Sequence, residues 1–314
     1  MFDSEKVLVI IPTHSNAGTL KQALRSVEIQ THENFEVQII GDGSTAEVTA
    51  IAEEFSARDQ RFKYRNCAKS KRKGEEYRHE AIMESEAKLI TYLQDDDLFM
   101  PNHIHYSINE MRTSDFINPK PVFVSRTDMI WCIPTNIAYE SNRLWHLTGD
   151  TYQNSISLTG VMHSKEAYLK LEEPWVSTPD NNPYTDLYMW RKFLSTKGLV
   201  FKTTECSRVI NFLGGSNEYD ENKVSQNLSW FSKITDPDFE RWWDRKVSEI
   251  YSTRIAEMFS EKEHLEKKLN HLSAQKENLL VQNSLYVQRL EMIENSRTWR
   301  MASWYRVLKN LILR

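Results

Sequence analysis

The stretch Tyr92-Leu93-Gln94-Asp95-Asp96-Asp97-Leu98 ends an apolar run, residues 89–93, with three consecutive carboxylates. Short runs of β-branched and aromatic residues are typical of buried strands, so this run predicts a strand that stops at the acids. Adjacent carboxylates repel one another, and a hard divalent cation with oxygen ligands reverses that repulsion. The carboxyl end of a strand is also where open α/β sheets bind their ligands. The alternative is a solvated acidic turn that caps the next helix.

Apolar runs that precede the acidic stretch alternate with helical patterns. The runs cover residues 7–11, 35–40 and 62–64. The first is continuous and β-branched, as in a central parallel strand buried on both faces, and the second ends at Gly41-Asp42-Gly43-Ser44-Thr45. Between the strands we expect a helix with Thr19 as its N-cap and an amphipathic helix over residues 48–55. This alternation predicts a parallel, right-handed α/β unit.

Length and composition are those of a globular protein with a substantial core. The chain has 314 residues, 40% hydrophobic and 11% aromatic, enough for one large or two small domains. A net charge of −4 gives no electrostatic reason to expect a nucleic-acid partner. Cys67, Cys132 and Cys206 lack metal-ligand spacing and favour a reducing cytoplasm over a disulfide framework. No apolar run approaches the roughly 20 residues of a membrane span, and we expect no signal peptide.

The middle of the chain predicts further strands and one definite helix. Expected strands lie at residues 122–125, 129–131, 161–163, 199–201 and 209–212. A helix opens at Asp186 and runs to about residue 197, where Gly198 can terminate it. Residues 133–160 predict no definite element, and residues 213–222 have the composition of a mobile lid.

From Ser248 onward the sequence follows one heptad register without Gly or Pro. Every d position is apolar while the a positions mix Leu and Ile with Lys and Asn, which is typical of a coiled-coil seam. A helix packed on its own domain, the alternative, has a wider apolar stripe. We therefore predict homo-oligomerisation through residues 248–296, with a dimer favoured. The a positions are Ile255, Lys262, Leu269, Lys276, Asn283 and Leu290, and the d positions are Tyr251, Met258, Leu265, Leu272, Leu279, Tyr286 and Ile293.

Residues 297–314 carry five Arg or Lys side chains and no acid, interleaved with Trp, Tyr, Leu and Met. A basic helix with Trp and Leu on its other side is typical of an interfacial membrane anchor, and the alternative is packing on a dimer partner.

We expect three parts: an α/β domain over residues 1–235, a helical linker and coiled coil over 236–296, and the basic tail over 297–314. The expected location is cytoplasmic, peripheral at the inner face of the cell membrane.

Several motifs occur in an order and at spacings that resemble the family 2 glycosyltransferases over roughly residues 6–215. They are Ile11-Pro12-Thr13, Ala23-Leu24-Arg25-Ser26-Val27 with Gln30-Thr31, Gly41-Asp42-Gly43-Ser44-Thr45, and the acidic stretch. The resemblance implies the GT-A fold, a Rossmann-like mixed sheet flanked by helices, followed here by a long coiled-coil helix. It also implies a nucleotide-sugar donor, commonly UDP-linked, a Mn²⁺ or Mg²⁺ ion, and transfer with inversion at the anomeric carbon.

The resemblance assigns the nucleotide side of the donor site first. Pro12 and Thr13 would lie against the base and ribose, and Asp42 would hydrogen-bond the base. Gly41 stands where the family usually has another acid. Arg78 stands where the family often has a basic residue near the donor.

In the acidic stretch, Gln94 stands where many relatives have the first acid, so the resemblance implies Asp96 as the metal ligand. Asp95 would then contact the ribose or a metal-bound water, and Asp97 would support them or cap the helix after Pro101. Carboxylates suit Mg²⁺ and Mn²⁺, which stabilise a departing diphosphate as Lewis acids.

The acceptor side follows from the same resemblance. Inversion requires a base opposite the leaving group, and Asp186 matches the family's acid at the start of a helix, with Asp180 as the second candidate. The alternative for Asp186 is a helix N-terminal acid favoured by the dipole. His163 would contact the donor phosphate or the acceptor, or else is a hydrogen-bonded structural residue. Trp175 and Trp190 either stack on sugar rings or belong to the core.

The sequence therefore predicts a metal-dependent, inverting glycosyltransferase that acts on a hydroxyl of a glycan or lipid-linked acceptor in cell-surface polysaccharide biosynthesis. A nucleotidyltransferase is the first alternative, although residues 12–18 lack the glycine-rich, lysine-bearing phosphate loop that class needs. A non-catalytic coiled-coil scaffold with a degenerate transferase domain is the second.

Overall fold

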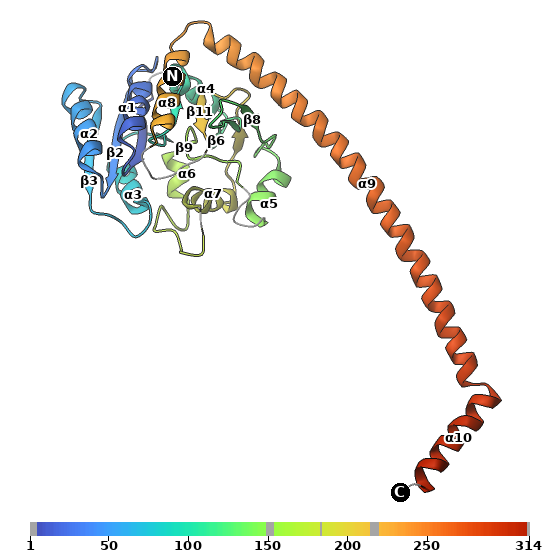
Figure 1. The fold of residues 1–314 in the computed structure, drawn as a ribbon. Helices are drawn as coiled ribbons and strands as arrows, with labels where there is room; N and C mark the ends of the chain where they lie inside the picture. The colour runs from blue at the N-terminus through green and yellow to red at the C-terminus, as the bar shows by residue number, and fades with distance from the viewer. Residues whose placement is uncertain (1–4, 149–153, 183, 214–219, 313–314) are drawn as a thin grey trace. The chain divides into compact units, whose positions relative to one another are not determined.

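The computed structural model describes residues 5–148, 154–182, 184–213 and 220–312 (Figure 1). The chain divides into two compact units, Met1–Ser252 and Thr253–Arg314. The first unit holds both β-sheets, and the second consists of helix.

The central sheet of the first unit has seven strands in the order β10-β6-β9-β4-β1-β2-β3. Strands β4, β1, β2 and β3 run parallel, and β10 is parallel to β6, but β9 runs antiparallel to both of its neighbours. This confirms the mixed α/β sheet. The strands are β1 (Val7–Thr13), β2 (Phe35–Asp42), β3 (Phe62–Cys67), β4 (Leu89–Tyr92), β6 (Phe116–Asn118), β9 (Met162–Ser164) and β10 (Phe201–Thr203).

Helices cover both faces of this sheet (Figure 1). Side chains alternate between the faces along β1, since Val9 packs in one hydrophobic core and Leu8 and Ile10 pack in the other. This explains the continuous apolar run in the sequence. The first core takes α1 (Ala17–Glu28), α2 (Ala46–Arg58) and α4 (His103–Met111), and the second takes α3 (Glu75–Glu84), α6 (Lys165–Leu169) and α7 (Thr185–Ser195).

The start of α1 differs from the expectation. Asn16, not Thr19, occupies the N-cap position, and its side chain makes no capping hydrogen bond. Thr19 lies inside the first turn, where its hydroxyl donates to the Asn16 carbonyl at 3.3 Å. The Asn16 side chain turns instead to Asp95, as described below, so the turn after β1 is shaped by the acidic stretch.

A second sheet of four strands, in the order β5-β11-β7-β8, carries a third core. Ile210 of this sheet packs with Trp230 and Trp243 from the following helices. The expected lid is partly helix, because α8 begins at Glu221; residues 214–219 lie outside the described residues. The elements are β5 (Leu98–Phe99), β7 (Val122–Val124), β8 (Ile130–Cys132), β11 (Val209–Phe212), α5 (Glu140–Thr148) and α8 (Glu221–Ile234).

Helix α9 (Phe239–Glu294) starts inside the first unit. Trp243, Val247 and Tyr251 recur every four residues and are buried in the third core. The Trp243 indole donates to the Ser207 carbonyl at 3.0 Å, and the Tyr251 hydroxyl donates to the Pro121 carbonyl at 3.0 Å. The compact unit therefore ends at Ser252 and not at the expected residue 235.

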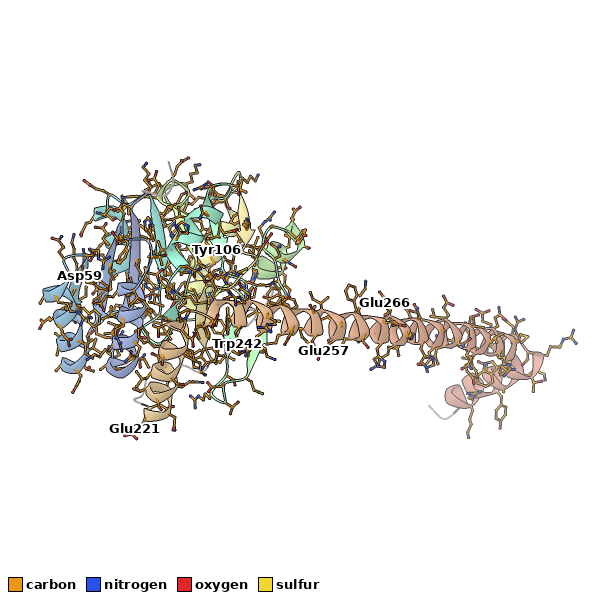
Figure 2. The ribbon with its side chains drawn as sticks, turned by 90° about the horizontal axis from the view of Figure 1, so that it is seen from above. Asp59, Tyr106, Glu221, Trp242, Glu257 and Glu266 are labelled. Carbon is orange, nitrogen blue, oxygen red and sulfur yellow. The ribbon has the colours of Figure 1, made fainter. Side chains whose placement is uncertain are left out.

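The second unit contains the rest of α9 and α10 (Arg297–Ile312). Figure 2 shows side chains, including Glu257 and Glu266, projecting from α9. Among the described residues of this unit, the expected d positions Leu265, Leu272 and Leu279 are more than half exposed. Nowhere in the described chain is a helix both long and apolar enough to cross a membrane.

Candidate active site

Asp95 joins the ends of two neighbouring strands. Its carboxylate accepts hydrogen bonds from the Thr13 hydroxyl at 2.7 Å and from the Asn16 amide at 3.0 Å, so it lies against the turn that follows β1. Burial, reinforced by the charge of Asp96, raises the pKa of Asp95 to about 6, although the bonds from Asn16 and Thr13 act against this. The structure thus brings together Thr13 and Asp95, which the resemblance placed on the donor side.

Asp97 points away from solvent and is only 1% exposed. Its carboxylate accepts from the Thr159 hydroxyl and, at 2.8 Å, from the Phe212 backbone N–H. Burial and the charge of Asp96 raise the pKa of Asp97 well above its usual value, against the effect of these bonds. Asp97 does not cap the next helix, because Asn102 occupies the N-cap of α4 without a side-chain cap. Asp97 links the acidic stretch to β11.

Asp96 has a cation as its partner. The Lys223 ammonium of α8 lies 2.6 Å from Asp96 Oδ2, and the two side chains are 12% and 14% exposed. The Asn227 amide, one turn further along α8, donates to the Asp96 carbonyl at 2.9 Å. The solvated-turn alternative for the acidic stretch is therefore wrong. Sequence reasoning missed Lys223, which lies 127 positions from its partner.

Asp42 ends β2 and is held by the basic loop after β3. The Lys69 ammonium pairs with its carboxylate, and the Ser70 N–H donates to it at 2.5 Å. Burial by itself raises the pKa of Asp42, but these two partners outweigh it and leave the pKa below its usual value. At Gly41, a Cβ would lie 2.6 Å from the Tyr64 hydroxyl, which explains why this position carries no acid.

Arg78 lies in α3 with 2% of its surface exposed. One guanidinium nitrogen donates to the Lys73 carbonyl at 2.8 Å, and the group stacks over the Trp175 ring at 4.7 Å. Within the described chain, Nε and Nη1 of Arg78 have no hydrogen-bond partner. Burial lowers the pKa of Arg78, while the charges of Glu75 and, more weakly, of Asp186 and Asp42 oppose this. Two unpaired buried donors are suited to an anionic ligand.

Asp186 lies in the first turn of α7, as expected. It is partly buried, and the Asn154 amide donates to it at 3.5 Å. Burial raises the pKa of Asp186, against the Leu187 N–H and the charges of Lys73 and Arg78. Asp180, the second candidate base, is exposed and pairs with the Lys71 ammonium at 3.0 Å. Asp186 is also one of the charges that act on Arg78.

His163 lies in the second hydrophobic core and not at the surface. It is 0% exposed within β9, among Phe116, Tyr168 and Phe193. Its Nε2 lies 2.8 Å from the Tyr92 hydroxyl, and burial lowers its pKa to about 4. Trp175 and Trp190 are buried in the same core. The structure therefore supports the structural alternative for all three side chains.

The acidic stretch offers few free side chains to a divalent cation. No group of three or more His, Cys, Asp or Glu side chains in the described residues could hold a metal ion. Asp95 and Asp97 are bound by neutral donors of the fold, whereas the Asp96 carboxylate faces an ammonium. One carboxylate fits Mg²⁺ or Mn²⁺ when phosphates and water supply the remaining oxygens. Of the three acids, Asp96 is the one that would contribute a carboxylate to such an ion, and its partner in the structure is the Lys223 ammonium.

The fold and the acids at its strand ends define a GT-A glycosyltransferase. Residues 8–164 match the family model described as glycosyl transferase family 2. This match covers half of the 314 residues, and the chain belongs to that family. Family membership favours glycosyl transfer over the nucleotidyltransferase and scaffold alternatives. Asp186 and Lys223 lie outside the matched segment.

Known relatives cover parts of the chain. An uncharacterized glycosyltransferase of Rickettsia bellii is 37% identical over 112 residues, which are 36% of this chain and 16% of that protein. One from Rickettsia typhi is 25% identical over 211 residues, 63% of this chain and 61% of that protein. The chain thus spans less than two thirds of these relatives. The crystal structure of S. aureus TarS 1-349 has a TM-score of 0.50 at 14% identity, covering 73% of this chain and 71% of that one, a likeness in fold.

Proposed function

We propose that the chain transfers a sugar from a nucleotide-sugar donor, UDP-linked, to an acceptor hydroxyl with inversion at the anomeric carbon. The observation that carries this proposal is the buried Arg78 guanidinium, which has two unpaired N–H groups and interacts electrostatically with both Asp42 and Asp186. In the family these two acids lie on the nucleotide side and the acceptor side. A diphosphate between them would give the unpaired guanidinium an anionic partner.

On the donor side, Pro12 and Thr13 end β1 and would lie against the base and ribose. Asp42 would hydrogen-bond the base, and Asp95, held by Thr13, would bind the ribose or a metal-bound water. A Mn²⁺ or Mg²⁺ ion at Asp96 would supply positive charge to the departing diphosphate. The side chains of the site would then need only to orient the donor and exclude water. A donor held in this way favours direct displacement of the diphosphate by the acceptor oxygen.

On the acceptor side, the Asp186 carboxylate accepts the proton of the acceptor hydroxyl as its oxygen attacks the anomeric carbon. The bond from that carbon to the diphosphate oxygen breaks, and its electron pair leaves with the diphosphate. The raised pKa of Asp186 supports this role, because a base is more effective when its pKa approaches the working pH. Arg78 would hold the diphosphate on the opposite side.

The exposed second unit supports a wider proposal. Residues 248–296 would form a homo-oligomer, with a dimer favoured, and the basic aromatic tail over residues 297–314 would bind the inner face of the cell membrane. The acceptor would be a glycan or a lipid-linked sugar in cell-surface polysaccharide biosynthesis, because the tail brings the active site to the lipid surface.

The test is donor turnover by Asp186→Asn against its matched control, Asp180→Asn. Release of nucleotide diphosphate from a panel of sugar nucleotides is measured with Mn²⁺ and with EDTA. We expect Asp186→Asn to lose at least about a hundredfold in rate, the scale of general base catalysis, with Asp180→Asn unchanged. Loss in the Asp180 variant with normal turnover in the Asp186 variant would refute the assignment of the base.

A further inference from the structure

Helix α8 holds the acidic stretch through two side chains one turn apart. Lys223 pairs with the Asp96 carboxylate at 2.6 Å, and Asn227 donates to the Asp96 carbonyl at 2.9 Å. The carboxylate of Asp220 caps the helix, accepting from the Asn222 N–H at 3.0 Å, which fixes the turn that carries Lys223. Glu221, at the start of α8, is labelled in Figure 2. The Lys223 ammonium is therefore placed by a rigid element.

The close approach of α8 depends on a glycine. Helix α8 packs against α1, and a Cβ at Gly18 would lie 2.5 Å from a methyl group of Val224. Valine is branched at Cβ and has little freedom to move aside. Gly18 thus allows Val224, the neighbour of Lys223 in α8, to sit directly on the turn that contains Asn16. Position 18 offers an independent means to displace α8.

A divalent ion at Asp96 and the Lys223 ammonium would share one carboxylate. A Mn²⁺ or Mg²⁺ ion held by the Asp96 carboxylate would bring a second cation next to the Lys223 ammonium, which pairs with Oδ2 at 2.6 Å. Two cations this close repel strongly in a partly buried site. The charge of Lys223 also acts on Asp95 and Asp97, so the ammonium serves the whole cluster.

We propose that Lys223 is the resident counter-ion of Asp96, which excludes a divalent ion until a diphosphate enters and takes the ammonium as its own partner. This rests on the proposed function, which assigns the metal to Asp96. Lys223 then becomes a further donor-binding residue, and metal and diphosphate bind together rather than one after the other. The pair is partly exposed, so the ammonium can exchange partners without unfolding α8.

The experiment is equilibrium dialysis of the full chain against Mn²⁺, with and without inorganic pyrophosphate, counting the manganese bound by the protein. Lys223→Met is compared with its matched control, Lys233→Met, in the last turn of the same helix and stacked on Trp230 at 4.3 Å. Without pyrophosphate we expect Lys223→Met to bind Mn²⁺ about tenfold or more tightly than wild type, and the control to match wild type. Pyrophosphate should strengthen Mn²⁺ binding more in wild type than in Lys223→Met.

Equal Mn²⁺ affinity in wild type and Lys223→Met would overturn the proposal. If Lys223→Met does not fold, Gly18→Ala gives the second measurement, because the displaced α8 should also raise Mn²⁺ affinity. Adding Asp96→Asn to Lys223→Met separates the two hypotheses. If the double variant still binds Mn²⁺ as tightly, the metal residue of the proposed function is wrong. If the double variant no longer binds Mn²⁺ while Lys223→Met binds Mn²⁺ with wild-type affinity, only the proposed role of Lys223 is wrong.

Discussion

Lowering the pH should lower the free energy of unfolding through His163. This side chain is buried in a chain of hydrogen bonds in which each donor and each acceptor is defined. The Trp175 indole donates to the Tyr92 hydroxyl at 3.0 Å, and His163 Nδ1 lies 3.1 Å from the Ser164 carbonyl, which can only accept. The Nδ1 proton is therefore present, and Nε2 accepts from Tyr92 at 2.8 Å. A proton on Nε2 would leave the Tyr92 hydroxyl proton without an acceptor.

The size of the effect follows from the two pKa values. The usual His value is 6.5, and burial lowers the pKa of His163 to about 4. Because the folded-state pKa is the lower one, the unfolded chain takes up the proton first, and stability that is present above pH 6.5 is lost as the pH falls toward 4. The difference corresponds to roughly 3 kcal/mol of unfolding free energy. Few single contacts contribute as much.

Urea unfolding, followed by tryptophan fluorescence at several pH values, measures this loss. We expect His163→Gln to lose roughly 3 kcal/mol less than wild type between pH 6.5 and 4, because glutamine does not titrate there. His105→Gln, at an exposed position on α4, is the matched control and should follow wild type. Parallel pH curves for wild type and His163→Gln would refute the reasoning. Loss of transfer activity by the folded variant at neutral pH would instead support a contact of His163 with the donor phosphate or the acceptor.

Three further changes test other parts of the molecule. Tyr92→Phe leaves the Trp175 indole without its acceptor and should lower the unfolding free energy by about 1–3 kcal/mol in the same urea assay. A chain that ends at Ser252 should sediment as a monomer while the full chain sediments as an oligomer; a dimeric truncation contradicts the coiled coil. Removal of residues 297–314 should abolish co-sedimentation with anionic vesicles, and unchanged binding rules out the anchor.

The first part of the central sheet could be predicted because its signals are local. The apolar run at residues 7–11 is the strand β1, and the acids after residue 93 lie where a strand end places them. Each of these features depends on a few consecutive residues or on one neighbouring strand.

Elements that depend on distant partners could not be predicted correctly. Thr19 has the chemistry of an N-cap, but the Asn16 side chain bonds to Asp95 and the helix begins earlier. Tyr251 fits the d position of the heptad register, yet it is buried in the first unit. A spacing of four residues suits a coiled-coil seam and also a helix packed on its own domain, so the sequence alone does not separate them. The sequence placed His163 on the acceptor side. In the structure His163 belongs to β9, which lies antiparallel between β4 and β6.

The three consecutive acids show how local pattern and distant partners divide the site. Asp95 is bound by the turn after β1, and Asp97 by Thr159 and the β11 backbone, so both are held by neutral donors. Asp96 alone among the three faces a cation, and that cation belongs to α8, outside the segment that matches the family model. The neutral partners of Asp95 and Asp97 are fixed by the fold. The ammonium that pairs with Asp96 lies on a surface helix and can be exchanged for another positive charge. The family pattern therefore identifies which carboxylates are present, and the chain beyond residue 164 supplies the cation that pairs with one of them.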